Sequence, residues 1–186
     1  MAPKHPGKSK STASPAWPPK VPMGPIEDVL PLVSEDDDSL DTLMIPSPGL
    51  LGEGCEGADF GPDEMKYVCQ CLEKNKSVTQ LNASMSPIGD AGAAHLARLL
   101  EAGKAPLLRI SLNGCSIGPE GAKALAKALV HSDVMVLELM NNHISDQGCE
   151  ALIAAARENK RLKELKVSFN SISERLETEL EKLLMR

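Results

Sequence analysis

Hydrophobic residues in the C-terminal two-thirds of the chain recur in columns. The first column holds Leu81, Ile110, Leu137 and Leu165, with steps of 29, 27 and 28 residues. Three further columns stay in register with it: Ala83, Leu112, Leu139 and Val167; Ile88, Ile117, Ile144 and Ile172; and Leu96, Leu125, Leu152 and Leu180. A repeat period in the twenties predicts a solenoid, in which each copy buries its apolar face against the next.

The stretch LRISLNGCSIGPEGAKALAKAL, residues 108–129, shows what one copy contains. Apolar residues first alternate at Ile110 and Leu112, which predicts a strand with one face turned inward. After the turn, Leu125 and Leu129 follow at a spacing of four, which predicts a helix with an inward stripe. Glycine or serine, followed by Asp, Glu or Pro, stands where each helix begins and suits helix capping. Each copy is therefore predicted to be a strand, a turn and a helix.

A partial copy precedes the four full ones. Residues 60–64 (FGPDE) lie 28 residues before residues 88–92 (IGDAG), and this spacing predicts a helix over 62–74 without a strand before it. In the last copy, Leu176 replaces the glycine of the earlier copies, and terminal repeats are expected to be atypical and more polar. We expect a repeat domain over 59–186, with an N-terminal cap helix in 59–77 and four repeats in 78–186.

The segments LLRISLNGCSI and VMVLELMNNHI fit the pattern LxxLxLxxN/C-x-I/L followed by a long helical half. With Cys115, Asn142 and Asn170 at the turn position, residues 60–186 resemble the ribonuclease-inhibitor-like class of leucine-rich repeats. The first copy departs from the pattern, because Ser86 occupies this turn position. The resemblance implies an α/β fold, a curved solenoid with a parallel sheet on the concave face and helices on the convex face. It also implies protein binding, since the class mostly binds other proteins, with varied partners.

Composition separates residues 1–58 from the repeats. Of the 14 prolines, 11 lie in residues 1–62, and residues 1–58 carry a net charge of −5 against −1 for residues 59–186. The segment begins basic, becomes acidic and contains one aromatic residue, Trp17. Such a segment cannot bury enough apolar surface to offset its ordering entropy. We therefore expect residues 1–58 to form a disordered N-terminal arm that precedes the solenoid.

Short apolar clusters alternate with carboxylates in the second half of this arm. One interpretation is a motif that orders on a partner protein. Its candidate anchors are Leu40, Leu43, Met44 and Ile45. The other interpretation is a solubilising tail whose apolar residues bind nothing. The candidate phosphorylation sites, where a phosphate would add a charge of about −1.5 to −2, are Ser34, Ser39 and Ser47.

Strand residues that alternate with the buried columns define a candidate binding surface on the concave face of the sheet. The candidate partner-binding residues are Arg109, Ser111, Asn113, Val136, Glu138, Met140, Glu164 and Lys166. We expect Arg109, Glu138 and Met140 to lead the contacts with a protein or peptide. Glu138 and Lys166 should lie side by side on adjacent strands and pair. The alternative is a sheet face that is only solvated, and the open edge of the last strand is a second candidate surface.

No constellation of residues indicates catalysis. Of the four histidines, only His143 lies near a repeated turn, and no second catalytic group is visibly paired with it. Each G-x-x-G stretch belongs to a helix start in the repeat register, which favours a structural role over phosphate binding. A zinc site at Cys69 and Cys71 would need a better spacing than C-x-C on a helix. We expect no catalytic residue, no cofactor and no bound metal.

The charge and the cysteines restrict the partner and the compartment. The near-neutral repeat domain argues against nucleic acid, and no apolar run approaches the roughly 18–20 residues of a membrane span. Five cysteines without a signal peptide indicate reduced thiols. We expect a non-enzymatic intracellular interaction module, with the cytoplasm favoured over the nucleus and no small-molecule substrate. It would be an adaptor or a structural subunit of a larger assembly; the alternative is a regulator of a small GTPase, because the Ran GTPase-activating protein has leucine-rich repeats of similar period.

Overall fold

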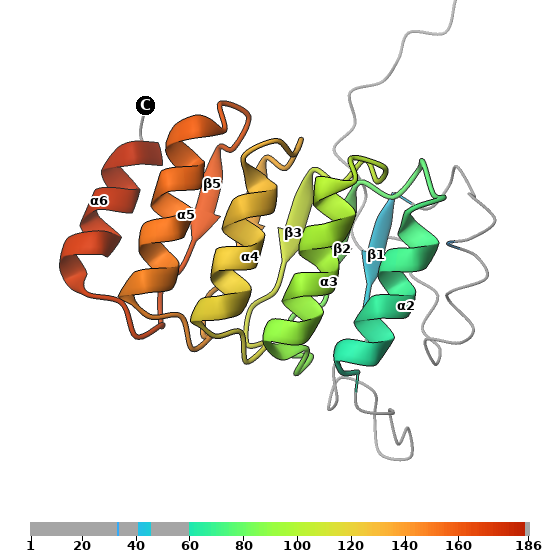
Figure 1. Cartoon of the computed structure of the whole chain (residues 1–186), viewed down its shortest axis with the longest axis horizontal. Helices are drawn as coiled ribbons and strands as arrows, with labels where there is room; N and C mark the ends of the chain where they lie inside the picture. Colours follow the sequence, from blue (N-terminus) through green and yellow to red (C-terminus); the bar gives the residue numbers. More distant parts are fainter. Residues whose placement is uncertain (1–32, 34–40, 46–59, 185–186) are drawn as a thin grey trace, which may run out of the picture.

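Strands and helices alternate along the chain and form a curved array (Figure 1). The computed structural model of the chain describes residue 33 and residues 41–45 and 60–184. The strands are β1 (Thr42–Met44), β2 (Gln80–Asn82), β3 (Arg109–Ser111), β4 (Val136–Glu138) and β5 (Glu164–Lys166). The helices are α2 (Pro62–Leu72), α3 (Gly89–Glu101), α4 (Pro119–Leu129), α5 (Asp146–Glu158) and α6 (Glu174–Leu184).

The strands form one parallel sheet in the order β1-β2-β3-β4-β5, and the helices line one side of it (Figure 1). The register places Leu81 beside Ile110, Ile110 beside Leu137 and Leu137 beside Leu165, so the first sequence column is one row across the sheet. All four apolar columns are buried except Ile172, which is half-buried. The predicted leucine-rich-repeat solenoid is confirmed.

A glycine recurs near the start of three successive helices, at Gly92, Gly121 and Gly148, and brings neighbouring helices together. A Cβ atom on Gly121 would lie 3.1 Å from the Cβ of Ala93 in α3, and one on Gly148 would lie 3.0 Å from the Cβ of Ala122 in α4. Both distances are shorter than ordinary side-chain contacts. Glycine therefore sets the close spacing of the helices along the convex face, and Leu176 ends this close stacking at α6.

A strand that the sequence pattern did not predict precedes α2. β1 lies within residues 1–58, expected to be disordered, yet it pairs in parallel with β2, and the N–H of Ile45 donates to the carbonyl of Asn82 at 2.7 Å. Leu43 and Ile45, two of the candidate partner anchors, are buried in the chain's own core with 1% and 5% exposure. The spacing explains the difference, because Leu43 precedes Leu81 by 38 residues, well outside the repeat period. Residues 1–32, 34–40 and 46–59, with Leu40 and the three candidate phosphorylation serines, lie outside the described residues.

Aspartates join the start of a helix to the repeat before it. The Asp90 Oδ1 atom accepts hydrogen bonds from the N–H of Gly118 at 2.7 Å and of Gly121 at 2.9 Å, at the start of α4. Asp146 in α5 likewise accepts from the N–H of Ser173 at 2.7 Å, just before α6. The capping predicted within each copy is thus supplied in these two places by the preceding copy, where a carboxylate also favours the positive end of the helix.

The asparagines at the turn position tie adjacent turns together. Asn142 Oδ1 accepts from the N–H of Cys115 at 2.9 Å and of Ile117 at 3.0 Å, while its Nδ2 donates to the carbonyl of Leu112 at 2.8 Å. At the equivalent position of the first repeat, the Ser86 Oγ atom is buried and has no hydrogen-bond partner within the described part of the chain. Among the described residues, the serine of the first copy therefore makes none of the side-chain hydrogen bonds that asparagine makes at this position.

Candidate protein-binding surface

The concave face carries the side chains that alternate with the buried columns. The register sets Arg109, Val136 and Glu164 in one row across β3, β4 and β5, and Ser111, Glu138 and Lys166 in the next. These two rows bring six of the eight predicted residues together. They differ in access, however: Ser111 and Val136 are only 7% and 8% exposed. Val136, one of two predicted apolar contacts, is therefore largely closed to a partner.

Glu138 is the centre of a polar network on this face. Its Oε1 atom lies 2.9 Å from Lys166 Nζ and 3.9 Å from a guanidinium nitrogen of Arg109. Its Oε2 atom accepts hydrogen bonds from Ser111 Oγ at 2.7 Å and from Asn113 Nδ2 at 3.5 Å. The pairing of Glu138 with Lys166 that the sequence predicted is confirmed. The network connects β3, β4 and β5 across the concave surface.

The network shifts the titration of both charged partners. Burial alone would raise the pKa of Glu138, but the hydrogen bonds from Lys166, Ser111 and Asn113, with the positive charge of Lys166, together hold that pKa below its ordinary value. Hydrogen bonds to Glu138 and Glu164 raise the pKa of Lys166 above its ordinary value. Both side chains are thus held in their charged forms.

The centre of the network is enclosed, whereas its periphery is exposed to solvent. The side chain of Glu138 is only 15% exposed, whereas those of Arg109, Glu164 and Lys166 are 44%, 42% and 40% exposed. Glu138 is therefore the enclosed partner of its neighbours, and the three outer charges are accessible from solvent. Among the other predicted residues, Asn113 accepts a hydrogen bond from the N–H of Met140 at 2.8 Å, and both side chains are half-buried.

Two exposed apolar residues that the sequence analysis missed follow β2 and β5. Met85 is 58% exposed and Phe169 is 81% exposed. Both have a left-handed backbone, with φ of 66° and 62°, which bulky side chains rarely adopt. The equivalent residues of the other two repeats, Gly114 and Asn141, have the same conformation, with φ of 67° and 56°. We call these four residues the left-handed row. Glycine and asparagine tolerate a left-handed backbone, so their presence at this position in two repeats was a sequence signal that the bulky Phe169 is unusual there.

A groove lies at the C-terminal end of the sheet, between β5 and α6. It has a volume of about 530 Å³ and is lined by residues 163–168 and by Glu177, Leu180, Glu181 and Leu184 of α6. Its lining includes the buried side chains of Leu165 and Leu180. The open edge that the sequence placed at residues 165–168 therefore lies beside a cavity rather than on a flat surface.

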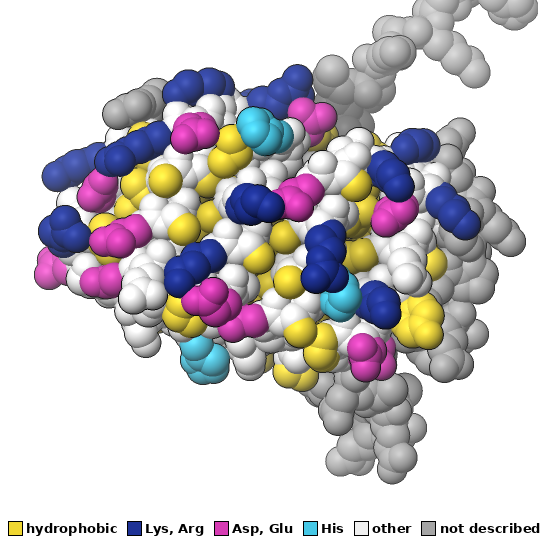
Figure 2. Space-filling model, in the orientation of Figure 1, with side chains coloured by type: hydrophobic (Ala, Val, Ile, Leu, Met, Phe, Trp, Pro, Cys, Tyr) yellow, Lys and Arg dark blue, Asp and Glu magenta, His cyan; other side chains and the backbone are white. Residues whose placement is uncertain are grey.

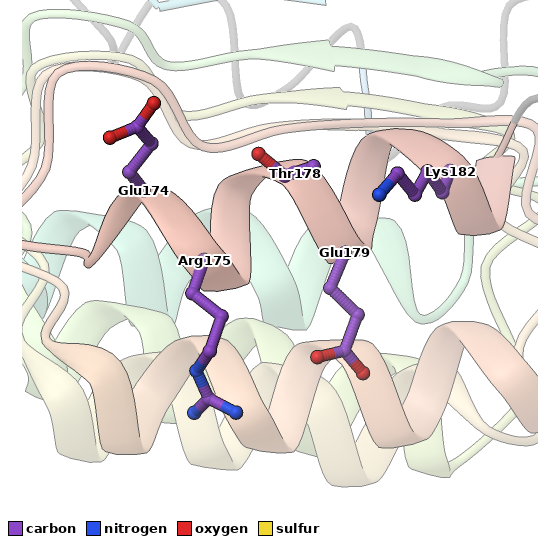
Figure 3. A pocket seen from close by; sticks show the side chains of 5 residues that line it. All are labelled: Glu174, Arg175, Thr178, Glu179 and Lys182. Atoms are coloured by element: carbon purple, nitrogen blue, oxygen red, sulfur yellow. The ribbon is translucent and has the colours of Figure 1, made fainter.

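A second cavity, of about 550 Å³, lies on α6 and is lined by charged and polar side chains of that helix alone (Figure 3). Arg175 and Glu179 point toward α5 in Figure 3, where they form ion pairs with Glu150 and Arg157. On the helical face as a whole, Figure 2 shows basic and acidic side chains interspersed, without a large area of one sign. This surface offers mixed charge rather than a basic path for a nucleic acid backbone.

The described residues contain no cluster of three or more side chains suited to hold a metal ion. Burial raises the pKa of Cys69 to about 12, and the pKa values of Cys115 and Cys149 to about 11. These thiols are therefore protonated at neutral pH, unlike the thiolates that act as nucleophiles or zinc ligands. Among the described helices, none combines the length and the apolar composition needed to cross a lipid bilayer.

Comparison with known proteins identifies the repeats. A family model described as "Leucine Rich repeat" matches residues 104–126 and 131–153. Human NACHT, LRR and PYD domains-containing protein 13 is 34% identical over 98 residues, which are 52% of this chain and 9% of that protein. Mouse ribonuclease inhibitor is 28% identical over 120 residues, 64% of this chain and 24% of that protein. The RAN GTPase-activating protein 2 of Arabidopsis thaliana is 28% identical over 97 residues, 52% of this chain and 18% of that protein.

Solved structures show the same fold at low sequence identity. The actin-binding site 2 domain of leiomodin-1 aligns with a TM-score of 0.69 and 19% identity, covering 87% of this chain and 88% of that one. The C-terminal domain of tropomodulin from Caenorhabditis elegans aligns with a TM-score of 0.65 and 17% identity, covering 87% and 92%. The chain spans no more than about a quarter of the length of the relatives named above. The repeats of this chain are leucine-rich repeats in a short array, and they are similar to those of the ribonuclease-inhibitor-like class.

Proposed function

We propose that this protein is a non-enzymatic protein–protein interaction module, an adaptor or a structural subunit of a larger intracellular assembly. The observation that carries the proposal is the network on the concave face, in which Glu138 pairs with Arg109 and Lys166 and Lys166 also pairs with Glu164. Charges that are already positioned lose little conformational entropy when a partner binds, which favours specific recognition of a protein or peptide.

The surface chemistry favours a protein over other partners. The repeat domain has a net charge of −1, and the concave face presents both signs of charge within two adjacent rows. A nucleic acid or an anionic membrane would be attracted by a basic surface, which this chemistry does not provide. The free cysteines among the described residues support an intracellular location, with the cytoplasm favoured over the nucleus.

The described residues give little support for catalysis. The raised pKa values of the buried thiols disfavour a cysteine nucleophile. Glu138, the carboxylate with the most hydrogen bonds on the concave face, is held as an ion with its oxygens already engaged. A general acid or base must instead exchange its proton near neutral pH.

Capture of partners from the cells that make the protein tests the proposal. The full chain and its Arg109→Glu variant would be compared under the same conditions. We expect this charge reversal to reduce the recovery of concave-face partners about tenfold, as for a leading interface residue. Lys127→Glu is the matched control. This substitution makes the same change of charge on the convex face, where the Lys127 side chain is 79% exposed. Equal recovery with both variants would contradict a concave binding surface.

Regulation of a small GTPase is the second candidate function. The similarity to the RAN GTPase-activating protein 2 over 97 residues favours it. If it holds, adding the full chain should accelerate GTP hydrolysis by purified Ran in single-turnover measurements, and Arg109→Glu should show whether the concave face is needed. An unchanged hydrolysis rate over a range of small GTPases would leave the interaction module as the better account.

A further inference from the structure

We propose that the C-terminal end of the solenoid binds an extended segment of a partner protein as a sixth parallel strand, with Phe169 lying across the turn of that segment. This inference rests on the proposed interaction function and specifies a surface, a strand direction and the chemistry of the ligand. Three features of the described residues carry it: the backbone of β5, the groove beside it and the left-handed row.

The backbone of β5 is arranged for another strand. The N–H of Glu164 donates to the carbonyl of Met135, and the carbonyl of Lys166 accepts from the N–H of Leu139, so these two residues turn toward β4. Successive residues of a strand turn their backbone groups alternately to its two sides, so Leu165 and Val167 turn theirs to the free side. Within the described residues β5 is the last strand of the sheet. An edge of this kind recruits an extended chain through its backbone.

The direction of the added strand follows from the rest of the sheet. Every pair from β1–β2 to β4–β5 is parallel. In β3, Arg109 and Ser111 turn their backbone groups to the preceding strand, because the Arg109 N–H donates to the carbonyl of Thr79 and the Ser111 carbonyl accepts from the N–H of Ala83. A sixth parallel strand would bind β5 in the same way, through the backbone groups of two residues that are separated by one residue, as Arg109 and Ser111 are in β3.

The groove specifies the side chains of the ligand. Its wall on α6 includes Leu180 and Leu184, which suit apolar residues on the helix-facing side of the added strand. Glu177 and Glu181 also line it, and no ion-pair partner for either occurs among residues 60–184. On the concave side, the partner's residue in the row of Arg109 and Val136 would lie next to Glu164. The matching ligand therefore has alternating apolar residues and a basic residue beside Glu164.

Met85 shows what a large residue in the left-handed row contacts. A Cβ atom built on Gly114, in the next repeat, would lie 2.6 Å from the Met85 sulfur, so the Met85 side chain covers that glycine. Phe169 has the same place in its repeat and nearly the same φ, yet 81% of it is exposed. By analogy, Phe169 would cover the turn of a sixth strand that carries glycine at the corresponding position.

A peptide with the sequence of residues 107–114, LLRISLNG, has this chemistry. It provides apolar residues at Ile110 and Leu112, the basic Arg109 between Leu108 and Ile110, and the turn glycine Gly114. Binding of the acetylated and amidated peptide to the isotope-labelled full chain would be followed by NMR. We expect saturable shifts of the amide signals of residues 163–169 and of α6. Absence of such shifts at about 1 mM peptide would overturn the proposal, as would shifts that centre on β1.

Two matched pairs of changes test the geometry. Phe169→Asn, which suits the left-handed backbone, should weaken peptide binding about tenfold, whereas Met85→Asn should leave it unchanged. N-methylation of the peptide at Ser111 removes an N–H directed at β5 and should also weaken binding about tenfold, whereas N-methylation at Ile110 should not. Equal effects within either pair would overturn the strand model.

The same experiments separate this inference from the proposed function. If Arg109→Glu abolishes partner capture while the peptide leaves residues 163–169 unshifted, the interaction module stands and the sixth strand fails. If no partner is captured but the peptide binds with the predicted dependence on Phe169, the proposed concave-face function fails and the end site stands. Self-association of the chain that Phe169→Asn abolishes would assign this end to a second copy and overturn the proposal of a different partner.

Discussion

The two ends of the solenoid differ in how the exposed edge of the sheet is covered. At the N-terminal end, β1 covers the edge of β2, and Val33, Leu43 and Ile45 from before residue 60 are buried in the core. At the C-terminal end, α6 packs against α5 and borders an open groove beside β5, and the aromatic ring of Phe169 is exposed. Interior repeats share their chemistry because each must fit two neighbours. The end repeats have one neighbour fewer, so their residues can depart from the pattern without disturbing the stacking of the repeats.

Removing the buried side chain of β1 should give the largest effect at the N-terminal end. Leu43→Ala should lower the free energy of unfolding by about 2–4 kcal/mol, because Leu43 is 1% exposed and its loss leaves a cavity. Urea unfolding of the full chain measures this. Met44→Ala is the control, since Met44 is half-buried on the other face of the same strand, and it should cost much less. Equal, small effects of both changes would show that β1 adds little to the stability of the solenoid.

Removing the hydrogen bonds of Asp90, which link two repeats, should give the next largest loss of stability. Asp90→Ala leaves the N–H groups of Gly118 and Gly121 without their shared acceptor, and we expect a loss of about 1–2 kcal/mol. Asp146→Ala, near the C-terminal end, removes the single hydrogen bond to the exposed Ser173 N–H and should cost less. Thermal unfolding of the two variants compares the interior of the array with its end. A larger loss for Asp146→Ala would reverse this ranking.

Residues with a regular spacing were predictable from sequence, and residues outside it were not. The columns predicted β2 to β5 and the Glu138–Lys166 pair, because the period fixes which residues are neighbours. β1 was missed because Leu43 lies 38 residues before Leu81. The sequence did not indicate that Glu138 is mostly enclosed, because its enclosure depends on hydrogen bonds from side chains on two other strands, β3 and β5.

Relief of backbone strain at the C-terminal end should have a smaller, opposite effect. A left-handed backbone costs a bulky residue roughly 1–2 kcal/mol, and asparagine tolerates it better. Phe169→Asn should therefore raise the free energy of unfolding by up to about 1 kcal/mol, because its exposed ring contributes little packing. Met85→Asn should gain less, since it also loses the contact with Gly114. Chemical unfolding of both variants tests this. A clear destabilisation by Phe169→Asn would show that the ring packs within its own chain, which would weaken its assignment to a partner.

The smallest expected effect is on stability in acid. The pH dependence of unfolding distinguishes the contribution of the concave network from that of the two ends. Since the folded pKa of Glu138 is depressed, its stabilising contribution is present above its ordinary pKa of 4.5 and is lost as the pH falls through the folded value. Glu138→Gln should therefore flatten the fall of the unfolding free energy below about pH 4.5. Glu120→Gln, the same substitution at a side chain that is 74% exposed on α4, is the control. Because Phe169 lies at the end of the sheet and does not titrate, Phe169→Asn should shift the whole curve without changing its slope. If Glu138→Gln had no effect on the slope, the network would hold Arg109, Glu164 and Lys166 less firmly than the concave binding surface requires.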